Sequence, residues 1–422
     1  MRGMRMLTVA VLLLCAFAAA AQPFVGDAVL SDALAARHTQ IQAAAPAVAM
    51  ARDRQGVAIA WTMLNAVGAQ AVYVARLDSS GRIVAPAKEI SSAGTANSVD
   101  AYWPSMAVLP GGTGFTLAWV ERLRVARPSY ASAVYSQLGA DLTPSAPRLL
   151  TTIATGEVST PAIVRSGAST WISAGGTVWE IHANGSPGQL LDAGSPVTDM
   201  VAAADYPQVV SGQNIQTGVL CLPNPGCTST GVFRFCYPGC RVDGLAYELR
   251  IVALFKGSAV RRFSFKSDSG AAIESNGRDL LVAWLSGDPG AGGVVTAVRL
   301  DATSFDFVER DLDGGRDIGT FGPDSTARRP DIAADDERFV VVWSTKTPRG
   351  DRDIVGAVID GSGRITSFPL ATSAADESDP SILKLSSNFL VAYELNNGDG
   401  KQGDRRIATR FVRFSGRRRS VH

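Results

Sequence analysis

Apolar and polar positions repeat along this chain in short alternating runs. The clearest copy occupies residues 329–364, where a proline precedes a short apolar run and a second apolar run ends in an aromatic residue. A polar loop, an alternating run and a Gly-Ser-Gly turn complete the copy. Short β-branched and aromatic runs between clusters of Gly, Asp, Asn and Ser are typical of strands joined by turns. The copy therefore predicts strands at residues 331–334, 339–343 and 354–360.

Similar copies recur along the sequence. They open at Pro46, Pro104, Pro161, Ala271, Pro330 and Pro380. Most steps between openings are 50–59 residues, and the step from 161 to 271 is 110 residues, about two copies. A regular period of this size indicates a repeat architecture in which each copy is one supersecondary unit. No stretch after the N-terminal apolar segment shows a sustained helical period.

Four short antiparallel strands per copy predict the blades of a β-propeller. Proline suits the first residue of a strand, where no hydrogen-bond donor is lost from the ladder. We expect the aromatics that end the second strand to pack as core between blades: Trp61, Trp119, Trp284 and Trp343. The signature is degraded within residues 198–269. The mean spacing predicts seven blades, and a strand-by-strand count leaves eight as the alternative.

The two ends of the repeat array predict that the ring is closed. The last copy stops after its third strand, near Phe414, whereas a single strand-like run around residues 27–34 precedes Pro46. An N-terminal strand that completes the final blade would remove two exposed sheet edges. We therefore predict an all-β fold with one propeller domain at residues 22–416.

The N-terminus resembles a secretory signal peptide. Arg2 and Arg5 precede an apolar run at residues 7–17 and a stretch of alanines. Because this run is shorter than the ~20 residues of a spanning helix, we expect cleavage after residue 21, no membrane span and a secreted or periplasmic protein. A lipoprotein anchor at Cys15 is the alternative, although Leu14 stands where such motifs have a small residue.

Charge is nearly balanced. The chain has 40 Lys plus Arg against 39 Asp plus Glu, so nothing in its net charge favours nucleic acid or an acidic membrane as a partner. We expect a monomer. Residues 417–422 form a short basic tail.

The cysteines beyond the signal segment cluster within twenty residues. They are Cys221, Cys227, Cys236 and Cys240. In an exported protein this cluster predicts two local disulfides in an insertion or an irregular outer strand near residues 221–240. Four cysteines allow three pairings, and the sequence does not choose among them. A zinc site is the alternative, but the spacing lacks the paired C-x2-C of structural zinc sites.

The recurring pattern P-x-[IV]-A, F-[LV]-V-x-W, [IV]-x-A-x-[LI]-D and G-R resembles the repeats of uncharacterised secreted bacterial β-propellers. The copies that open at 46, 104, 271, 330 and 380 carry it in whole or in part. The resemblance implies the propeller fold and brings no catalytic residues. The fixed diglycine of kelch repeats, the Gly-His and Trp-Asp of WD repeats and the hairpin motif of sialidases are not found in it.

Motifs for known chemistry are sparse. The three histidines, His38, His182 and His422, are scattered, and neither G-x-S-x-G nor H-E-x-x-H occurs. Gly398, Gly400 and Gly403 match G-x-G-x-x-G, but no helix follows, so we interpret them as a hairpin loop. We expect no cofactor and no metal. Calcium is the weaker alternative, at Asp311, Asp313 and Asp317 or at Asn396, Asn397 and Asp399.

The propeller fold predicts where a ligand would bind. The first strand of each blade should line the central channel, and the residues just before each opening proline should surround its mouth. These candidates are Asp100, Tyr102, Trp103, Arg328, Arg329, Asp376, Glu377 and Asp379. Loops after the aromatic strand should flank the same face with Glu121, Arg122, Arg124, Lys346, Arg349, Asp351 and Arg352.

Aromatic and charged groups at one mouth suit recognition of a sugar or a peptide. We therefore predict a binding module for protein or carbohydrate ligands. The alternative is a secreted polysaccharide hydrolase or lyase that uses convergent carboxylates such as Asp100, Asp376 and Asp379. The sequence leaves the ligand and any catalysis open, since propellers host many functions.

Overall fold

The computed structural model describes the chain between residues 23 and 414. Its gaps are residues 31–47, 66–67, 85–86, 92–98, 124–129, 155–159, 194, 204–205, 222–226, 231–232, 237–239, 254–259, 266–269, 289–290, 309–314, 324–328 and 397–404. The predicted signal peptide, the basic tail and Arg328 lie outside the described residues.

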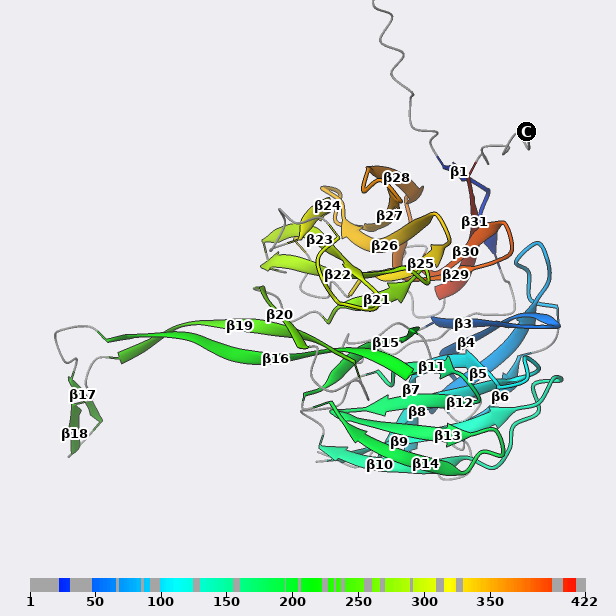
Figure 1. The fold of residues 1–422 in the computed structure, drawn as a ribbon, viewed down its shortest axis with the longest axis horizontal. Helices are drawn as coiled ribbons and strands as arrows, with labels where there is room; N and C mark the ends of the chain where they lie inside the picture. Colours follow the sequence, from blue (N-terminus) through cyan, green and yellow to red (C-terminus); the bar gives the residue numbers. More distant parts are fainter. Residues whose placement is uncertain are drawn as a thin grey trace, which may run out of the picture.

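Seven of the eight antiparallel sheets formed by the described residues are the blades of a single all-β propeller (Figure 1). Each of the first three blades has four strands in chain order. Blade 1 contains β3 (Val48–Asp53), β4 (Gly56–Leu64), β5 (Gln70–Leu77) and β6 (Lys88–Glu89). Blade 2 contains β7 (Val99–Val108), β8 (Phe115–Leu123), β9 (Tyr130–Leu138) and β10 (Arg148–Ala154). Blade 3 contains β11 (Ile163–Ser166), β12 (Ser169–Ala174), β13 (Thr177–His182) and β14 (Pro187–Asp192).

The remaining blades complete the ring, and they confirm the prediction of seven. Blade 4 contains β15 (Val197–Ala203), β16 (Tyr206–Cys221), β19 (Cys240–Ala253) and β20 (Val260–Phe265). Blade 5 contains β21 (Ala272–Ser275), β22 (Asp279–Asp288), β23 (Gly292–Asp301) and β24 (Arg316–Phe321). Blade 6 contains β25 (Asp331–Asp335), β26 (Arg338–Lys346), β27 (Arg352–Asp360) and β28 (Ile365–Ala371). Blade 7 contains β29 (Asp376–Lys384), β30 (Asn388–Asn396), β31 (Arg405–Arg413) and two short N-terminal strands.

Those two strands, β1 (Phe24–Val25) and β2 (Val29–Leu30), close the ring as predicted. Both pair antiparallel with β31, where Phe24 is opposite Arg413 and Val29 is opposite Thr409. The first strand of each blade contacts the first strand of the next, including β29 of blade 7 with β3 of blade 1. The N-terminal segment therefore covers the edge that β31 would otherwise expose.

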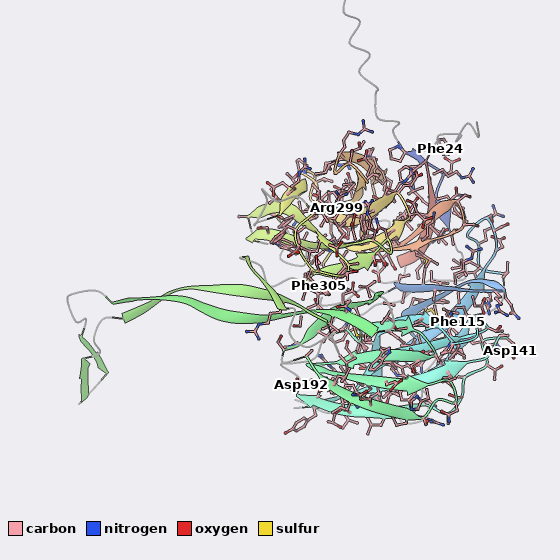
Figure 2. All side chains as sticks on the ribbon, in the orientation of Figure 1. Phe24, Phe115, Asp141, Asp192, Arg299 and Phe305 are labelled. Carbon is pink, nitrogen blue, oxygen red and sulfur yellow. The ribbon has the colours of Figure 1, made fainter. Side chains whose placement is uncertain are left out.

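The predicted aromatic side chains fill the contacts between blades, but they lie within the second strands, which continue three or four residues beyond each of them. Trp61, Trp119, Trp284 and Trp343 are all buried. Phe115 lies in the apolar cluster shared by blades 1 and 2, within the packed side chains of Figure 2. Because each large side chain fills a space made by two sheets, the repeated aromatic fixes the distance between neighbouring blades.

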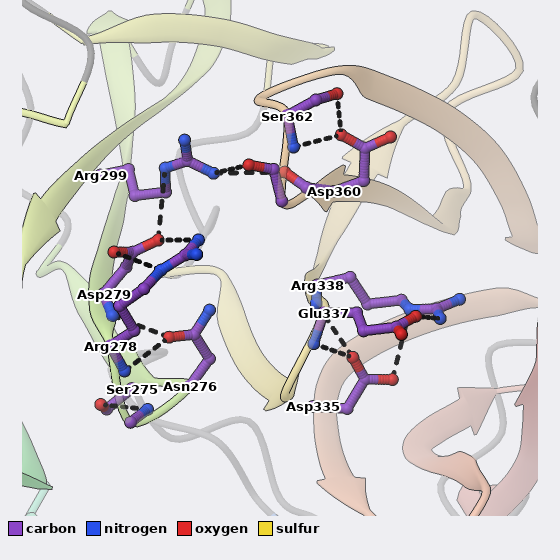
Figure 3. Close-up of polar contacts among 12 residues, drawn as sticks. Ser275, Asn276, Arg278, Asp279, Arg299, Asp335, Glu337, Arg338, Asp360 and Ser362 are labelled. Atoms are coloured by element: carbon purple, nitrogen blue, oxygen red, sulfur yellow. Dashed lines mark hydrogen bonds and ion pairs between the residues drawn. The ribbon is translucent and has the colours of Figure 1, made fainter. Parts of the chain in front are cut away.

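Arginines on the third strands join neighbouring blades at the face where the first and second strands turn. Arg299 of β23 lies 3.7 Å from the Asp279 carboxylate of its own blade. It also donates to the carbonyl oxygens of Asp360 and Gly361 in blade 6, each at 3.2 Å (Figure 3). The Arg299 side chain is only 8% exposed, so this contact is part of the interior rather than of the surface.

Blade 4 carries a long hairpin arm between its second and third strands. β16 and β19 remain paired from Gln208 opposite Ala253 to Cys221 opposite Cys240, and Figure 1 shows them projecting away from the ring. β17 (Cys227–Thr230) and β18 (Phe233–Cys236) form a second small hairpin at the tip. The cysteines were predicted to lie in an insertion or in an irregular outer strand. They lie in this arm, which is an insertion between the second and third strands of blade 4. Their side chains lie outside those described.

Candidate functional site

The centre of the ring contains a cavity of about 340 Å³. All seven blades contribute residues of their first strands to its lining, and these strands are β3, β7, β11, β15, β21, β25 and β29. This arrangement agrees with the expectation that these strands line a central channel. Pro104, Pro330 and Pro380, which open three of the copies, are themselves lining residues.

One arginine of blade 6 contacts two other blades at this cavity. Arg329, which precedes β25 in blade 6, has its Nη1 atom 3.0 Å from Oδ2 of Asp199 in blade 4. The same nitrogen donates to the carbonyl oxygen of Thr198 at 2.7 Å and to that of Ala271 in blade 5 at 3.5 Å. Arg329 therefore spans the beginning of blade 5, and it is a structural tie as well as a lining residue.

Two lining aspartates join consecutive first strands. Asp199 Oδ2 accepts the backbone N–H of Ile273 at 3.1 Å, which connects blade 4 to blade 5. Asp331 Oδ2 accepts the backbone N–H of Ile382 at 2.8 Å, which connects blade 6 to blade 7. Each carboxylate therefore accepts a backbone N–H from the first strand of the next blade.

Among the described lining residues, Glu274 and Asp331 are the two carboxyl groups whose pKa values are raised. Burial raises the pKa of Glu274 to about 8, against a hydrogen bond from the Ser275 N–H, and the nearby Asp199 and Asp331 charges add to the increase. Burial also raises the pKa of Asp331 to about 6, although the Arg329 charge opposes it. Glu274 is therefore largely protonated at pH 7, while Asp331 is mostly ionised.

The first strands of blades 2 and 7 begin five and four residues before their opening prolines, whereas those of blades 1, 3, 5 and 6 begin after their opening residues. We call these two extensions the raised walls, defined by residues 99–103 of blade 2 and 376–379 of blade 7. The first wall pairs with β8 from Val99 opposite Leu123 to Tyr102 opposite Val120. The second pairs with β30 from Asp376 opposite Asn396 to Ser378 opposite Glu394. Both walls flank blade 1, because β3 contacts both β7 and β29.

Each wall meets the channel at a strained bulge. Trp103 has φ 59° and Asp379 has φ 53°, and each is the residue before an opening proline. The register shifts at both places, between Tyr102 and Ser105 and between Ser378 and Ser381. Positive φ is unfavourable for residues other than glycine, and a following proline disfavours helical backbone as well. Such strain costs on the order of 1–3 kcal/mol per residue and is concentrated at functional sites.

The blade 2 wall carries an aromatic and cationic cluster. The Trp103 and Tyr102 rings are tilted with their centres 6.1 Å apart, and both residues are half-buried. The Arg122 guanidinium lies over the Trp103 ring, 5.0 Å from its centre. Asp100 is buried below them and accepts the Gln70 N–H at 2.8 Å, so it ties the wall to blade 1. Arg122, predicted to flank the mouth, thus contacts the predicted candidate Trp103.

In the blade 7 wall, two of the three predicted acids accept hydrogen bonds from neighbouring side chains of the protein. Asp376 accepts hydrogen bonds from the Arg352 Nε and Nη2 atoms, each at 3.0 Å. Glu377 is fully buried and accepts the Ser373 hydroxyl at 2.6 Å. Burial raises the pKa of Glu377, which the Ser373 hydrogen bonds oppose. Asp379 is the member of this group that lines the cavity.

The predicted candidates therefore gather in three places rather than at one point. Asp100, Tyr102 and Trp103 are in one wall, Asp376, Glu377 and Asp379 are in the other, and Arg329 is in the channel. The three carboxylates named for the hydrolase alternative are divided in the same way, and only Asp379 lines the cavity. Sequence reasoning missed the lining acids Asp199, Glu274 and Asp331. The available signal was an acidic residue within an otherwise apolar first strand, or directly after its proline.

The described part of the chain holds no group of three or more His, Cys, Asp or Glu side chains arranged for a metal ion. Most residues of the calcium alternative lie outside the described residues, so that alternative stays a prediction. No helix among the described residues is both long and apolar enough to cross a membrane.

No protein-family model matches the sequence, and no curated protein matches it. Solved structures with a similar fold include the β-propeller domain of the Trilobed protease from Pyrococcus furiosus, with 9% identity, a TM-score of 0.44 and coverage of 87% of this chain and 95% of that one. BamB from Moraxella catarrhalis has 10% identity, a TM-score of 0.39 and coverage of 93% and 100%. Trypanosoma rangeli sialidase in complex with sialic acid has 12% identity, a TM-score of 0.38 and coverage of 85% and 59%.

Proposed function

We propose that this protein is an exported binding module that holds its ligand at the channel mouth, between the two raised walls. The observation that carries the proposal is the pair of strained bulges at Trp103 and Asp379, on either side of blade 1. Four of the other blades, 1, 3, 5 and 6, begin their first strands at or after the opening position, so the ring does not need the walls to close. Two unfavourable backbone conformations at matching places are best explained by the groups they present.

The chemistry of the mouth suits recognition. Tyr102, Trp103 and Arg122 form one side, and tryptophan, tyrosine and arginine are the residue types that most often dominate binding energy at protein interfaces. The other side and the floor present Asp379 and a cavity whose lining combines apolar side chains with several charged ones. Ligand sites are commonly concave, mostly apolar and marked by a few convergent polar groups.

The test is binding of the purified mature chain to an array that carries both oligosaccharides and peptides, followed by titration of each hit. We expect Trp103→Gly to weaken binding at least tenfold, because it removes the aromatic surface and relaxes the bulge. Asp336→Asn is the matched control, since Asp336 is exposed in the turn between β25 and β26, at the opposite end of those strands from the channel mouth. Equal binding by both variants would refute a site between the walls.

A polysaccharide hydrolase is the second candidate function, and one observation favours it. Glu274, with a pKa of about 8, is protonated at neutral pH, and Asp331, with a pKa of about 6, is mostly ionised beside it. Two carboxyl groups whose pKa values are driven apart are a common arrangement for a general acid and its partner. Release of reducing ends from an oligosaccharide hit, lost in Glu274→Gln, would support this function. If the unmodified chain bound the oligosaccharide without cleaving it, the hydrolase function would be excluded.

A further inference from the structure

The channel mouth has more acidic than basic groups. Among the described residues, four acids line it, Asp199, Glu274, Asp331 and Asp379, and Arg329 is the one basic residue of the lining. Arg329 is already matched by Asp199 at 3.0 Å. The Ser275 N–H donates to Glu274 Oε1 at 2.8 Å. A concave site lined by one sign of charge attracts groups of the opposite sign.

We propose that the channel binds a basic side chain, an ammonium or guanidinium group on an aliphatic stem, presented by a segment of a protein ligand. This inference rests on the proposed function and specifies its ligand. The cationic group lies between Glu274 of β21 and Asp331 of β25, which are on neighbouring first strands. Trp103 and its neighbours in the blade 2 wall then contact the backbone and flanking residues of the same segment.

The remaining lining fits the stem of such a side chain. Met50, Met106 and Met200 come from blades 1, 2 and 4 and line the cavity. Methionine is flexible and polarisable, so it adapts to irregular apolar shapes. Lysine and arginine bury their methylene groups against apolar surface while the charged end finds polar partners. A volume of about 340 Å³ accommodates one long side chain.

Charge complementarity selects this ligand over two others. An acidic peptide would bring further negative charge to Glu274 and Asp331, and the Asp331 charge already raises the pKa of Glu274. A neutral sugar would bring no positive charge to Glu274 and Asp331. A bare divalent cation is disfavoured because the described residues contain no group of three ligands arranged for a metal.

Binding of a cation should release a proton. Among the described residues, the charged groups that share the cavity with Glu274 are Asp199 of β15, Asp331 of β25, Arg329 before β25 and Asp379 of β29. The first two act to keep Glu274 protonated. A bound cation favours the ionised form instead, so Glu274 loses its proton to the buffer. Affinity then increases with pH, by up to about tenfold per pH unit, until the pH reaches the pKa of Glu274 near 8.

The experiment compares four pentapeptides that differ only at the central residue, Ac-Gly-Gly-X-Gly-Gly-amide with X as Lys, Arg, Gln or Glu, displayed on a surface. A set of neutral oligosaccharides is displayed beside them. The labelled mature chain is applied at pH 6.0, 7.0 and 8.0. We expect the Lys and Arg peptides to bind at least tenfold more strongly than the Gln and Glu peptides, and their binding to increase with pH.

Two channel variants and one control complete the test. Glu274→Gln should remove the pH dependence and at least tenfold of the Lys and Arg binding, and Asp331→Asn should weaken the same binding while keeping an acceptor for the Ile382 N–H. Asp336→Asn should bind as the unmodified chain does. Far-UV circular dichroism confirms that each variant is folded, and two channel variants are made so that one folding failure leaves the other informative.

The outcomes separate this inference from the proposed function. Oligosaccharide binding that Trp103→Gly weakens, with no preference for Lys or Arg, would overturn the inference and leave the proposed function standing. Lys and Arg binding that neither channel variant changes would also overturn the inference, since the cation would then be held elsewhere. If no peptide or sugar bound with sensitivity to Trp103→Gly or to either channel variant, both proposals would fail.

Discussion

Arg76 and Asp53 form a bidentate ion pair in blade 1, with Nη1 and Nη2 each 2.7 Å from a carboxylate oxygen. The Asp53 side chain is fully buried and also accepts the Gly114 N–H of blade 2 at 2.9 Å. Arg76 donates in turn to the Ala140 carbonyl of blade 2 at 2.8 Å. Burial opposes ionisation of Asp53, but the hydrogen bonds from Arg76 and the backbone outweigh it and lower its pKa.

Replacement of Arg76 should therefore destabilise the ring strongly. Arg76→Met leaves the Asp53 carboxylate buried without its cation, which costs about 3–5 kcal/mol in comparable buried pairs. Urea unfolding followed by fluorescence measures the loss. Arg349→Met is the control, because the Arg349 side chain is 60% exposed and pairs with Asp351 at the surface, where such pairs contribute about 1 kcal/mol or less. Similar losses in both variants would contradict the interior role of Arg76.

Stability without ligand should decrease as pH rises from about 5 to above 8. Glu274 has a folded-state pKa of about 8, above its ordinary value of 4.5. Its neutral form therefore stabilises the fold fully below 4.5, and this contribution is lost as the pH rises through 8. Asp331 acts in the same direction between 3.8 and about 6. We expect the urea midpoint of Glu274→Gln to depend less on pH above 6, and an unchanged slope would contradict this assignment.

Glycine should be tolerated better than alanine at position 103. Alanine retains the unfavourable backbone at φ 59°, which costs roughly 1–2 kcal/mol for a residue with a Cβ atom. Glycine does not have this cost, so Trp103→Gly should unfold at a higher urea concentration than Trp103→Ala. At an ordinary strand position the order is reversed, because glycine weakens strands. Finding alanine more stable than glycine would mean that the bulge relaxes in solution.

Closure of the ring can be tested on two neighbouring residues of β1. Val25 packs against the core between blades 6 and 7, whereas Phe24 is 64% exposed. Val25→Asp should lower the free energy of unfolding by about 1–3 kcal/mol, because it places a polar group in apolar surroundings. Phe24→Asp should have little effect. Urea unfolding measures both changes. Ring closure by β1 would be contradicted if neither substitution changed the free energy of unfolding.

The cysteines of the arm should form nested disulfides. Cys221 is opposite Cys240 in the backbone register, and Cys227 is opposite Cys236. Opposite Cα atoms in antiparallel strands are ~4.5–5.5 Å apart, a separation that a disulfide can bridge. In material oxidised by a thiol–disulfide oxidase, non-reducing mass spectrometry should recover these two linked pairs. Four thiols open to alkylation, or a Cys221–Cys227 link, would refute the pairing.

The regular part of the fold was predictable because packing and turn residues repeat. Each copy places an aromatic such as Trp343 where two sheets meet, and the same physical requirement recurs at every interface. Blade 4 lost this signature because its second and third strands continue into the arm. The arm is not packed between two blades, so the packing requirement that produces the repeated aromatic does not apply to its residues.

The candidate site was predictable in its location and only partly in its residues. The first strands line the channel as expected, so Arg329 and Asp379 were found from their position before a proline. Glu274 was missed because it is the third residue of β21, inside the strand rather than before its opening position, where acidic side chains are uncommon. The bulges were missed because Trp-Pro and Asp-Pro dipeptides carry no signal for positive φ.

The closure by β1 also determines how the ring responds to a pulling force. Phe24 is opposite Arg413, so the two ends of the described chain leave blade 7 side by side, at the same end of the strand pair. Tension applied to these ends loads the hydrogen bonds between β1 and β31 one after another instead of all together. The pair therefore separates stepwise from one end. A force applied through the termini should detach the N-terminal strands from β31 well before the other six blades unfold.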